Sequence, residues 1–456
     1  MTIPAASPGR LGASYWKLFT ASVISNLGDG MGSVAYPWLA SAVTRNPILV
    51  ALVVVAQRLP WLVFTLPAGV ITDRVDRRKA MVSMDVVRGV ATLVVAVAVL
   101  SQQGVLPGPD EVETVVGTNV ALYVAVLVAT FCLGMAEVLR DNSAQTILPA
   151  IVHPDQLEKA NGRMWSVEGV TNTLIGPPLG SLLLVAAFSV PFFVDAGSFL
   201  VAAALVALIP GTFRAEADEA APNTSDEPEP SMVAGFKRDL AEGWNWLRGH
   251  SLLWPMAIIL GLMNGAGMIS GATFVLFAQE VLDVGPLLFT VIGFGGAAGG
   301  LLGGNLAPQI AKRFGPGACL AVTLAGMALA SLVIGIWAWW PVTLVMFGVN
   351  SFLAVLWNVI TVSLRQSIIP PRLLGRVNSV YRFFAWGMIP IGSAIGGITV
   401  VLVESLADRE LALRATFWVA AGVGALLFVF GRAKLTTDKI EAAKTAVAET
   451  GDGAGD

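Results

Sequence analysis

The sequence predicts an all-α integral membrane protein with twelve transmembrane helices, arranged as two six-helix bundles related by a pseudo-twofold axis along the membrane normal. Three observations predict this fold: the composition, a series of apolar runs of membrane-spanning length, and an internal repeat. Of the 456 residues, 55% are hydrophobic and only 13% are charged, and the mean hydropathy is +0.74. Soluble domains carry about 25% charged residues. The chain is therefore a membrane protein.

The composition also excludes several classes of function. The net charge of −3 leaves no basic excess to bind a polyanion, so no nucleic-acid partner is expected. The two cysteines and two histidines lie far apart and show no disulfide or metal-site spacing. Neither a G-x-x-x-x-G-K-[ST] loop nor a set of nucleophile, base and orienting residue is present. We therefore expect no ATP, cofactor or metal, and no enzyme.

The apolar runs predict where the chain crosses the membrane. A transmembrane helix needs about 20 predominantly apolar residues. The first run continues into further hydrophobic sequence without a cleavage site, so we interpret it as an uncleaved helix and not as a signal peptide. The expected spans lie near 15–44, 49–72, 80–101, 119–142, 158–187, 190–210, 251–281, 286–311, 318–338, 341–366, 377–402 and 413–431.

The distribution of bases orients these spans. One set of loops holds most of the lysines and arginines, including Arg74, Arg77, Arg78 and Lys79, whereas the opposite loops hold only Arg45, Arg409 and Arg414. Basic loops stay on the cytoplasmic side. The pattern predicts a multi-pass protein of the cytoplasmic membrane with both termini in the cytoplasm.

The polar interruptions divide the chain into four parts. The acidic, proline-rich stretch 214–231 is typical of disorder. After it, an apolar stripe at helical spacing predicts an interfacial helix on the inner leaflet, with a partner-binding helix as the alternative; the stripe is Val233, Phe236, Leu240, Trp244 and Leu247. The expected parts are an N-terminal six-helix bundle (1–210), a cytoplasmic linker (211–250), a C-terminal six-helix bundle (251–431) and a polar, mobile tail (432–456).

The two bundles share an internal repeat. The sequence QTILP at Gln145–Pro149 leads to LEKAN at Leu157–Asn161, and QSIIP at Gln366–Pro370 leads to LGRVN at Leu374–Asn378. Both copies stand at a turn before a long helix. Repeats in the same membrane orientation imply two bundles related by an axis along the membrane normal, with a cavity between them.

Three stretches of the sequence resemble a known family. The stretch GVITDRVDRRK from Gly69 to Lys79 is similar to the loop 2–3 signature G-x-x-x-D-R-x-G-R-R of the major facilitator superfamily, with Asp76 in place of a glycine. Asn26–Gly30 (NLGDG) and Ser363–Gly397 resemble its drug-efflux branch, which contains macrolide, multidrug and siderophore exporters. The resemblance covers nearly the whole chain, and it implies that superfamily's fold and secondary active transport.

The same stretch predicts a gating latch. Asp73 ends span 2 where span 11 should begin, and a carboxylate beside a helix N-terminus gains about 0.3 to 1 kcal/mol. The resemblance implies that the signature holds the outward-open state and that Arg77 pairs with Asp141. In the second half Pro308 replaces the acid, so the latch is expected to be one-sided. Topology alone is the alternative role for Arg74, Arg78 and Lys79. The latch residues are Gly69, Asp73, Arg74, Arg77, Arg78 and Asp141.

Ionisable residues within spans are functional candidates, because each costs at least about 2.5 kcal/mol to insert. Asp29, Glu137 and Glu168 lie deepest, and we interpret them as residues of proton coupling or substrate recognition, with Arg140 as their counter-charge. For Asp29, between two glycines, a hydrogen-bonded structural acid is the alternative. Packing or snorkelling explains the acids and bases near the inner helix ends equally well: Asp85, Arg88, Arg140 and Asp141. Arg58 and Asp195 complete the set.

Two glycine-containing motifs remain. GPPLG, with Gly176, Pro177 and Gly180, resembles the antiporter signature G-P-x-x-G of exporters and predicts a helix that bends and packs closely. The run GFGGAAGGLLGG at Gly293–Gly304 formally contains a dinucleotide fingerprint, but it lies inside an apolar span without a preceding strand. Close helix packing is the better interpretation of that run.

Together these observations predict a secondary active transporter that exports a hydrophobic or amphipathic small molecule, such as a drug, an antibiotic or a siderophore-like compound. Proton antiport with alternating access is the expected mechanism. The expected partners are the small-molecule substrate, protons and the lipid bilayer, and we expect a monomer. A lipid or metabolite transporter of the same fold, for example a lysophospholipid flippase, is the nearest alternative. A non-transporting receptor or scaffold is the alternative from another class.

Overall fold

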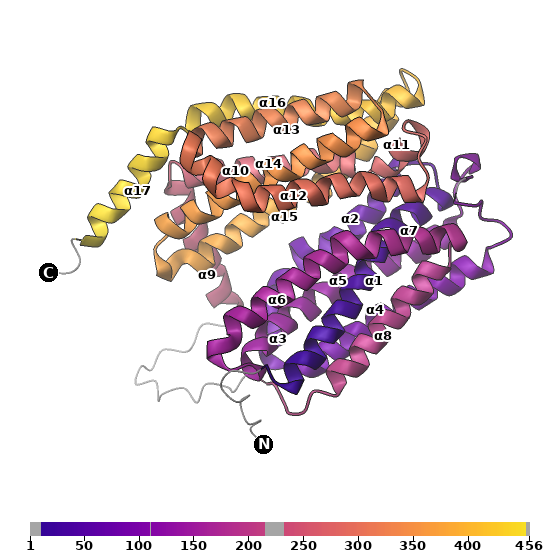
Figure 1. Ribbon diagram of the computed structural model, residues 1–456, viewed down its shortest axis with the longest axis horizontal. Coiled ribbons are helices and arrows are strands. Elements are labelled where there is room, and N and C mark those ends of the chain that lie inside the picture. Colours follow the sequence, from indigo (N-terminus) through magenta and orange to yellow (C-terminus); the bar gives the residue numbers. More distant parts are fainter. Residues whose placement is uncertain (1–10, 110, 215–231, 453–456) are drawn as a thin grey trace. The chain divides into compact units, whose positions relative to one another are not determined.

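The computed structural model describes residues 11–109, 111–214 and 232–452, and within these ranges the only extended pairing is one isolated bridge between Thr44 and Thr118 (Figure 1). All other regular structure in these ranges is helical. The described residues form two compact units, one of residues 11–214 with 278–290 and the other of residues 232–277 with 291–452. The expected all-α fold is confirmed.

The first unit is built from long helices, and two of its expected spans are interrupted: one divides into α2 and α3, and the other contains a π-helix. In it α1 packs against α7 and α8, α4 packs against α5 and α8, and α2 and α3 pack against α5. The helices are α1 (Ala13–Val43), α2 (Pro47–Val63), α3 (Thr65–Arg74), α4 (Arg77–Ser101), the 3₁₀ turn η1 (Val112–Thr114), α5 (Val120–Ile151), the 3₁₀ turn η2 (Pro154–Gln156), α6 (Leu157–Gly169), the π-helix η3 (Val170–Ile175), α7 (Gly176–Ala186) and α8 (Val190–Ala207).

The second unit has its core around Trp357, which is fully buried. In this unit α10 packs against α15 and α16, and α13 packs against α14 and α16. Residues 278–290 belong to the first unit, so α11 ends there and α12 begins there. The helices are α9 (Met232–Gly249), α10 (Leu253–Gly271), α11 (Phe274–Glu280), α12 (Pro286–Phe314), α13 (Pro316–Ile336), α14 (Trp340–Ile368), α15 (Pro371–Glu404), α16 (Arg409–Lys434) and α17 (Thr437–Asp452).

Each expected span corresponds to helical structure, and three spans are broken. Ten described helices have the length and composition to cross a membrane, and Pro47–Val63 is a shorter apolar helix. The second span divides into α2 and α3 at Val63, because Pro67 has no N–H to donate to the Val63 carbonyl four residues earlier. The fifth span contains the π-helix, and the seventh divides into α10 and α11. The chain is a multi-pass membrane protein.

Residues 278–290 are held in the first unit by polar contacts. The side-chain amide of Gln279 donates to the Ser41 hydroxyl at 2.9 Å, and Arg45 forms an ion pair with Glu280. The Ser181 hydroxyl donates to the Pro286 carbonyl at 2.9 Å. These contacts come from α1, the turn after it, and α7. The end of α11 and the first turn of α12 are therefore fastened to the N-terminal helices.

The helix α9 does not have the free apolar stripe that an interfacial helix needs. Leu247 is buried in the core of the second unit, and the Trp244 ring stacks on Phe384 with centroids 5.7 Å apart. A Cβ on Gly243 would lie 2.7 Å from the Arg376 carbonyl oxygen. This half of the stripe therefore covers α10 and α15 and not lipid. The position of α9 on the inner leaflet stays a prediction. The side chains of Val233 and Phe236 lie outside the described residues.

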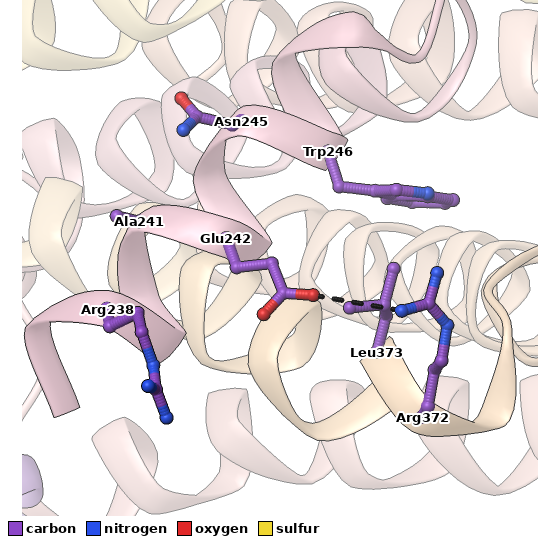
Figure 2. A pocket seen from close by; sticks show the side chains of 7 residues that line it. All are labelled: Arg238, Ala241, Glu242, Asn245, Trp246, Arg372 and Leu373. Atoms are coloured by element: carbon purple, nitrogen blue, oxygen red, sulfur yellow. Dashed lines mark ion pairs between the residues drawn. The ribbon is translucent and has the colours of Figure 1, made fainter. Parts of the chain in front are cut away.

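Charged side chains complete the docking of α9. Glu242 pairs with Arg376, and its other carboxylate oxygen lies 4.0 Å from Arg372 (Figure 2). Glu242 and Arg372 line a surface hollow of about 530 Å³, and Arg238 of α9 lines it as well. Because one carboxylate faces two arginines of α15, the linker helix is fixed in position by charge as well as by packing.

The C-terminal tail is also more ordered than its composition suggests. The structure places α17 where a polar, mobile tail is expected, and Leu435 and Ile440 are buried in the core of the second unit. This corrects the expectation of mobility as far as Ile440. The expected disorder of 214–231 falls, from residue 215 onward, outside the described residues.

The glycine run in α12 packs closely against α14. A Cβ on Gly295 would collide with the Leu344 carbonyl, and a Cβ on Gly299 would collide with the Gly348 carbonyl. Small residues that let two backbones approach are typical of membrane helix pairs. The interpretation of this run as a packing surface is confirmed.

Candidate functional site

The segment Gly28-Asp29-Gly30 lies at close helix contacts of the first unit. A Cβ on Gly28 would collide with the Asp195 carboxylate on α8. A Cβ on Gly30 would lie 2.7 Å from the Thr171 carbonyl oxygen in the π-helix and 2.9 Å from the Gly176 Cα. Only glycine permits such an approach. The α1 backbone is therefore held on both sides of Asp29, between α8 and the η3–α7 junction.

The partner of Asp29 is Arg88 on α4. The Arg88 guanidinium forms an ion pair with Asp29, donates to the Ser25 hydroxyl at 3.1 Å and lies 3.9 Å from the centroid of the Phe199 ring. The Arg88 side chain is only 2% exposed, whereas that of Asp29 is 33% exposed. The arginine is thus held by contacts from two other helices, α1 and α8, and the carboxylate is the accessible member of the pair.

The charges continue from Arg88 into α5. Asp85 is fully buried, 3.6 Å from the Arg88 Nη1, and accepts a hydrogen bond from the Arg140 Nε at 3.2 Å. The Arg140 Nη1 lies 3.5 Å from the Asp141 carboxylate. Asp29, Arg88, Asp85, Arg140 and Asp141 therefore form a row of alternating charge across α1, α4 and α5. We call these five residues the charge chain.

Further acids surround the charge chain. Asp195 is buried and accepts a hydrogen bond from the Ser198 hydroxyl at 3.4 Å. Glu137 lies within electrostatic range of Asp29 and Arg88, and also of Arg58. Glu168 is exposed on α6, within electrostatic range of Arg140 and Asp29.

The acids in this region outnumber the bases. The charge chain has three acids and two arginines, and the surrounding groups add three acids and one arginine. An uncompensated charge away from water costs several kcal/mol, and protons or a cation relieve that cost. The arrangement is chemically suited to binding and releasing protons.

The antiporter-like motif meets the Asp29 segment directly. A Cβ on Gly176 would lie 2.6 Å from the Gly30 Cα, and a Cβ on Gly180 would lie 2.6 Å from the Met31 carbonyl oxygen. The Pro177 carbonyl accepts a hydrogen bond from the Thr290 hydroxyl at 3.4 Å. π-Helices are rare and often occur at functional sites, and η3 leads into this motif. The structure therefore brings together two motifs that are about 150 residues apart in sequence.

The expected latch residues are only partly brought together. Gly69, Asp73 and Arg74 lie in α3, but the side chain of Asp73 is outside the described residues. Arg77 Nη1 donates to the Thr146 carbonyl at 3.3 Å, and Arg78 Nη1 donates to the Ile209 carbonyl at 2.6 Å. The Asp141 carboxylate lies beside Arg140. Among the described side chains, the expected ion pair between Arg77 and Asp141 is not formed.

Asp76, which replaces the signature's glycine, has a defined structural role. Its Oδ1 accepts a hydrogen bond from the Lys79 N–H at 3.0 Å, and its Oδ2 accepts one from the Phe213 N–H at 3.1 Å. The first contact caps the N-terminus of α4, for which aspartate is among the preferred residues. An aspartate immediately before a helical run was the available signal for this role.

Sequence reasoning gave too little weight to Asp85 and Arg88. Their position near a helix end allowed a packing or snorkelling role, but both are buried in the charge chain. The available signal was their spacing: an acid and a base three residues apart face the same side of a helix. In an apolar span such a pair indicates a buried network, not a surface contact.

The two histidines of the chain lie apart from the charge chain, near the starts of other helices. No group of three histidine, cysteine, aspartate or glutamate side chains among the residues that the structure describes could hold a metal ion. Both histidines accept backbone hydrogen bonds near helix starts, His153 from Asp155 and His250 from Leu252 and Leu253. Burial lowers the pKa of His250, which favours the neutral ring that can accept these bonds.

Comparison with known proteins identifies relatives along most of the chain. The sequence profile of the Major Facilitator Superfamily matches residues 18–392. The enterobactin exporters EntS of Citrobacter koseri and of Shigella boydii serotype 4 are 25% and 24% identical over 378 and 382 residues, which are 81% of this chain and 80% of each relative.

Solved structures show the same fold at low identity. A bacterial homologue of the iron transporter ferroportin, in an inward-facing state, has a TM-score of 0.67 and 14% identity over 92% of this chain and 98% of its own. A bacterial homologue of the human lysosomal transporter Spinster has a TM-score of 0.63 and 12% identity over 98% of each chain.

Proposed function

The chain belongs to the Major Facilitator Superfamily, and on that premise we propose that it is a secondary active exporter of a hydrophobic or amphipathic small molecule. It works by proton antiport with alternating access in the bacterial inner membrane. The observation that carries this proposal is the charge chain, in which the partly exposed Asp29 faces the buried Arg88. A carboxylate that is partly exposed to solvent and also paired with a buried arginine is suited to exchange protons with water.

The proposed coupling step involves only the charge chain. When Asp29 binds a proton, Arg88 loses one of its two counter-charges and moves toward Asp85, whose carboxylate lies 3.6 Å away. Because Asp29 lies between the two close contacts of α1, loss of the ion pair changes how α1 is held against α4. Release of the proton restores the pair. Arg140 stays paired with Asp85 during this cycle, since its Nε donates to the same carboxylate.

The driving force is sufficient for export. One proton moving down about 150 mV yields roughly 3.5 kcal/mol, at about 2.3 kcal/mol per 100 mV. At about 1.4 kcal/mol per tenfold ratio, this supports a substrate gradient of several hundredfold.

The relatives favour export and suggest a substrate for testing. The two curated relatives described above are named enterobactin exporters, and a siderophore is an amphipathic small molecule of the expected class. At about 25% identity the substrate can differ, so we use enterobactin as the first compound to test. A survival screen of expressing cells against a panel of toxic compounds would extend the list.

Asp29→Asn is expected to abolish proton coupling. The amide keeps the size of the side chain but cannot carry a proton in exchange for substrate. In proteoliposomes, enterobactin movement driven by an imposed pH gradient should fall by more than about tenfold, a loss equivalent to 1.4 kcal/mol. Enterobactin-dependent proton release, followed with a trapped pH-sensitive dye, should disappear.

The matched control for this test is Glu404→Gln, the same chemical change in an acid paired with Arg409 outside the charge chain. It should transport as the unmodified protein does. Unchanged gradient-driven movement in Asp29→Asn would refute the coupling role. Proton-independent movement of a labelled lysophospholipid, without enterobactin transport, would instead support a lipid transporter of the same fold.

The gating latch remains a proposal of its own. Asp73→Asn is expected to impair conformational cycling without affecting membrane insertion, because it removes the charge that would stabilise a helix N-terminus. The measurement is transport in proteoliposomes, normalised to the amount of inserted protein. Asp155→Asn, in an exposed side chain, is the matched control. Equal transport by both variants would exclude the latch.

A further inference from the structure

The second unit contains a cavity that the charge chain does not explain. It has a volume of about 400 Å³ and lies between α10, α12, α13, α14 and α16. The charge chain belongs entirely to the first unit. Small-molecule sites in proteins have volumes of about 300 to 1,000 Å³ and are lined mainly by apolar and aromatic side chains. The size of this cavity is therefore within the range of a ligand site.

The wall of the cavity is mainly apolar and carries no charged residue; its polar residues are Ser270, Ser331, Asn350 and Ser351. Three phenylalanines contribute to it: Phe274 and Phe347, whose ring centroids lie 4.9 Å apart, and the buried Phe417. Met263 and Met327 add flexible apolar surface. A charged group would be desolvated here without a partner of opposite charge. The wall therefore favours a neutral ligand with rings or chains.

Glycines on two helices keep the cavity open. A Cβ built on Gly267 or on Gly296 meets no atom within 4 Å, and both residues line the cavity. Side chains at these positions would occupy the empty volume without striking a neighbouring backbone. Glycine at these two positions therefore leaves part of the space unfilled.

One amide faces the cavity with its hydrogen-bonding groups uncommitted. Asn305 and Asn358 donate to the carbonyl four residues earlier, and Asn264 donates to the Ala385 carbonyl. The Asn350 side chain lines the cavity and makes no hydrogen bond to any described residue. An amide offers two donors and one acceptor. In an apolar wall, it can orient a ligand that carries a hydrogen-bonding group.

We propose that this cavity binds a neutral, mainly apolar molecule with one or two rings and a carbonyl-type acceptor that receives a hydrogen bond from Asn350. The phenylalanines and methionines contact the rings. The proposal deepens the proposed function, because it assigns the apolar part of the substrate to the second unit, and it rests on that function only for the link to export. Binding itself is independent of protons and of transport.

Benzophenone tests this proposal directly, because it is neutral and has two aromatic rings and one carbonyl. On illumination its excited carbonyl takes a hydrogen atom from a nearby C–H group, and the two radicals join, forming a C–C bond and an O–H group. No further reactant is needed. In the full-length protein in lipid nanodiscs, mass spectrometry should find the adduct on Met263 or Met327. The anionic analogue 4-benzoylbenzoate should not label these residues.

Two variants separate this cavity from general labelling. Gly296→Leu fills the space and should lower labelling of the methionines by at least about tenfold, equivalent to 1.4 kcal/mol. Gly293→Leu is the matched control, since Gly293 lies on the same helix, also has open space around its Cβ and does not line the cavity. Asn350→Leu keeps the side-chain size and should raise the half-saturating concentration by about two- to tenfold, the loss of one hydrogen bond.

The outcomes are distinct. Absence of label on both methionines, equal labelling by 4-benzoylbenzoate, or unchanged labelling in Gly296→Leu and Asn350→Leu would each overturn the proposal. If Gly296→Leu does not fold, as judged by size-exclusion chromatography, Asn350→Leu decides alone. Labelling should persist in Asp29→Asn. Loss of proton coupling with retained labelling would therefore test the proposed function and this site separately.

Discussion

Replacing Arg88 by methionine is expected to abolish transport and to destabilise the first unit by about 3 to 5 kcal/mol. The methionine fills a similar space, but Asp29 loses its ion-pair partner and Asp85 loses one of its two. Removing the buried member of a pair is costly because the charge left behind, here the partly exposed Asp29, loses its compensation in a region that is mostly out of water. Thermal unfolding of the detergent-solubilised protein measures the first effect, and enterobactin transport in proteoliposomes measures the second.

A charge-balanced double variant distinguishes stability from function. Arg88→Met with Asp29→Asn removes both charges of the pair, while Asp85 keeps its contact with Arg140. Thermal stability should largely recover, but transport should not. Arg163→Met is the matched control, because this arginine is exposed and lies 5.6 Å from the centroid of the Trp16 ring. Normal transport by Arg88→Met would show that the charge chain has no part in the cycle.

The fold was predictable because apolar runs of sufficient length have few alternatives in a membrane. The elements that differ from expectation are those whose burial depends on tertiary contacts. The stripe on α9 has the same pattern whether it covers lipid or protein, and only the contacts of Trp244 and Glu242 distinguish the two. The same holds for α17, where Ile440 and the preceding Leu435 are buried in the core of the second unit.

The site was predictable in its parts but not in its connections. Asp29 and the glycines beside it could be recognised, and so could Gly176 and Gly180, because each departs from an ordinary apolar span. Sequence spacing does not reveal that Gly30 and Gly176 touch, since that contact depends on how α1 and α7 cross. The position of Arg88 near a helix end gave no indication that Phe199 and Ser25 would enclose it.

Replacing Gly176 by alanine should reduce transport by more than about tenfold although it adds only one methyl group. The new Cβ would lie 2.6 Å from the Gly30 Cα and 2.7 Å from the Thr171 carbonyl oxygen. Backbone atoms cannot move aside as flexible side chains can, so α1 and α7 must separate. Overpacking of this kind costs about 1 to 3 kcal/mol, and the separation displaces Asp29 from Arg88. Enterobactin transport in proteoliposomes measures the loss.

The matched control is Gly162→Ala on α6, where a Cβ meets no atom within 4 Å. This change should leave transport intact and favour the helix by up to about 1 kcal/mol. Equal transport by the two variants would mean that the α1–α7 contact has no role in transport. Gly30→Ala should resemble Gly176→Ala, because its Cβ would strike the same pair of backbones. The double variant should lose less than the sum of the two, since residues in contact do not contribute independently. Additive losses would indicate two separate contacts, and Asp29 would then not be positioned by a single α1–α7 crossing.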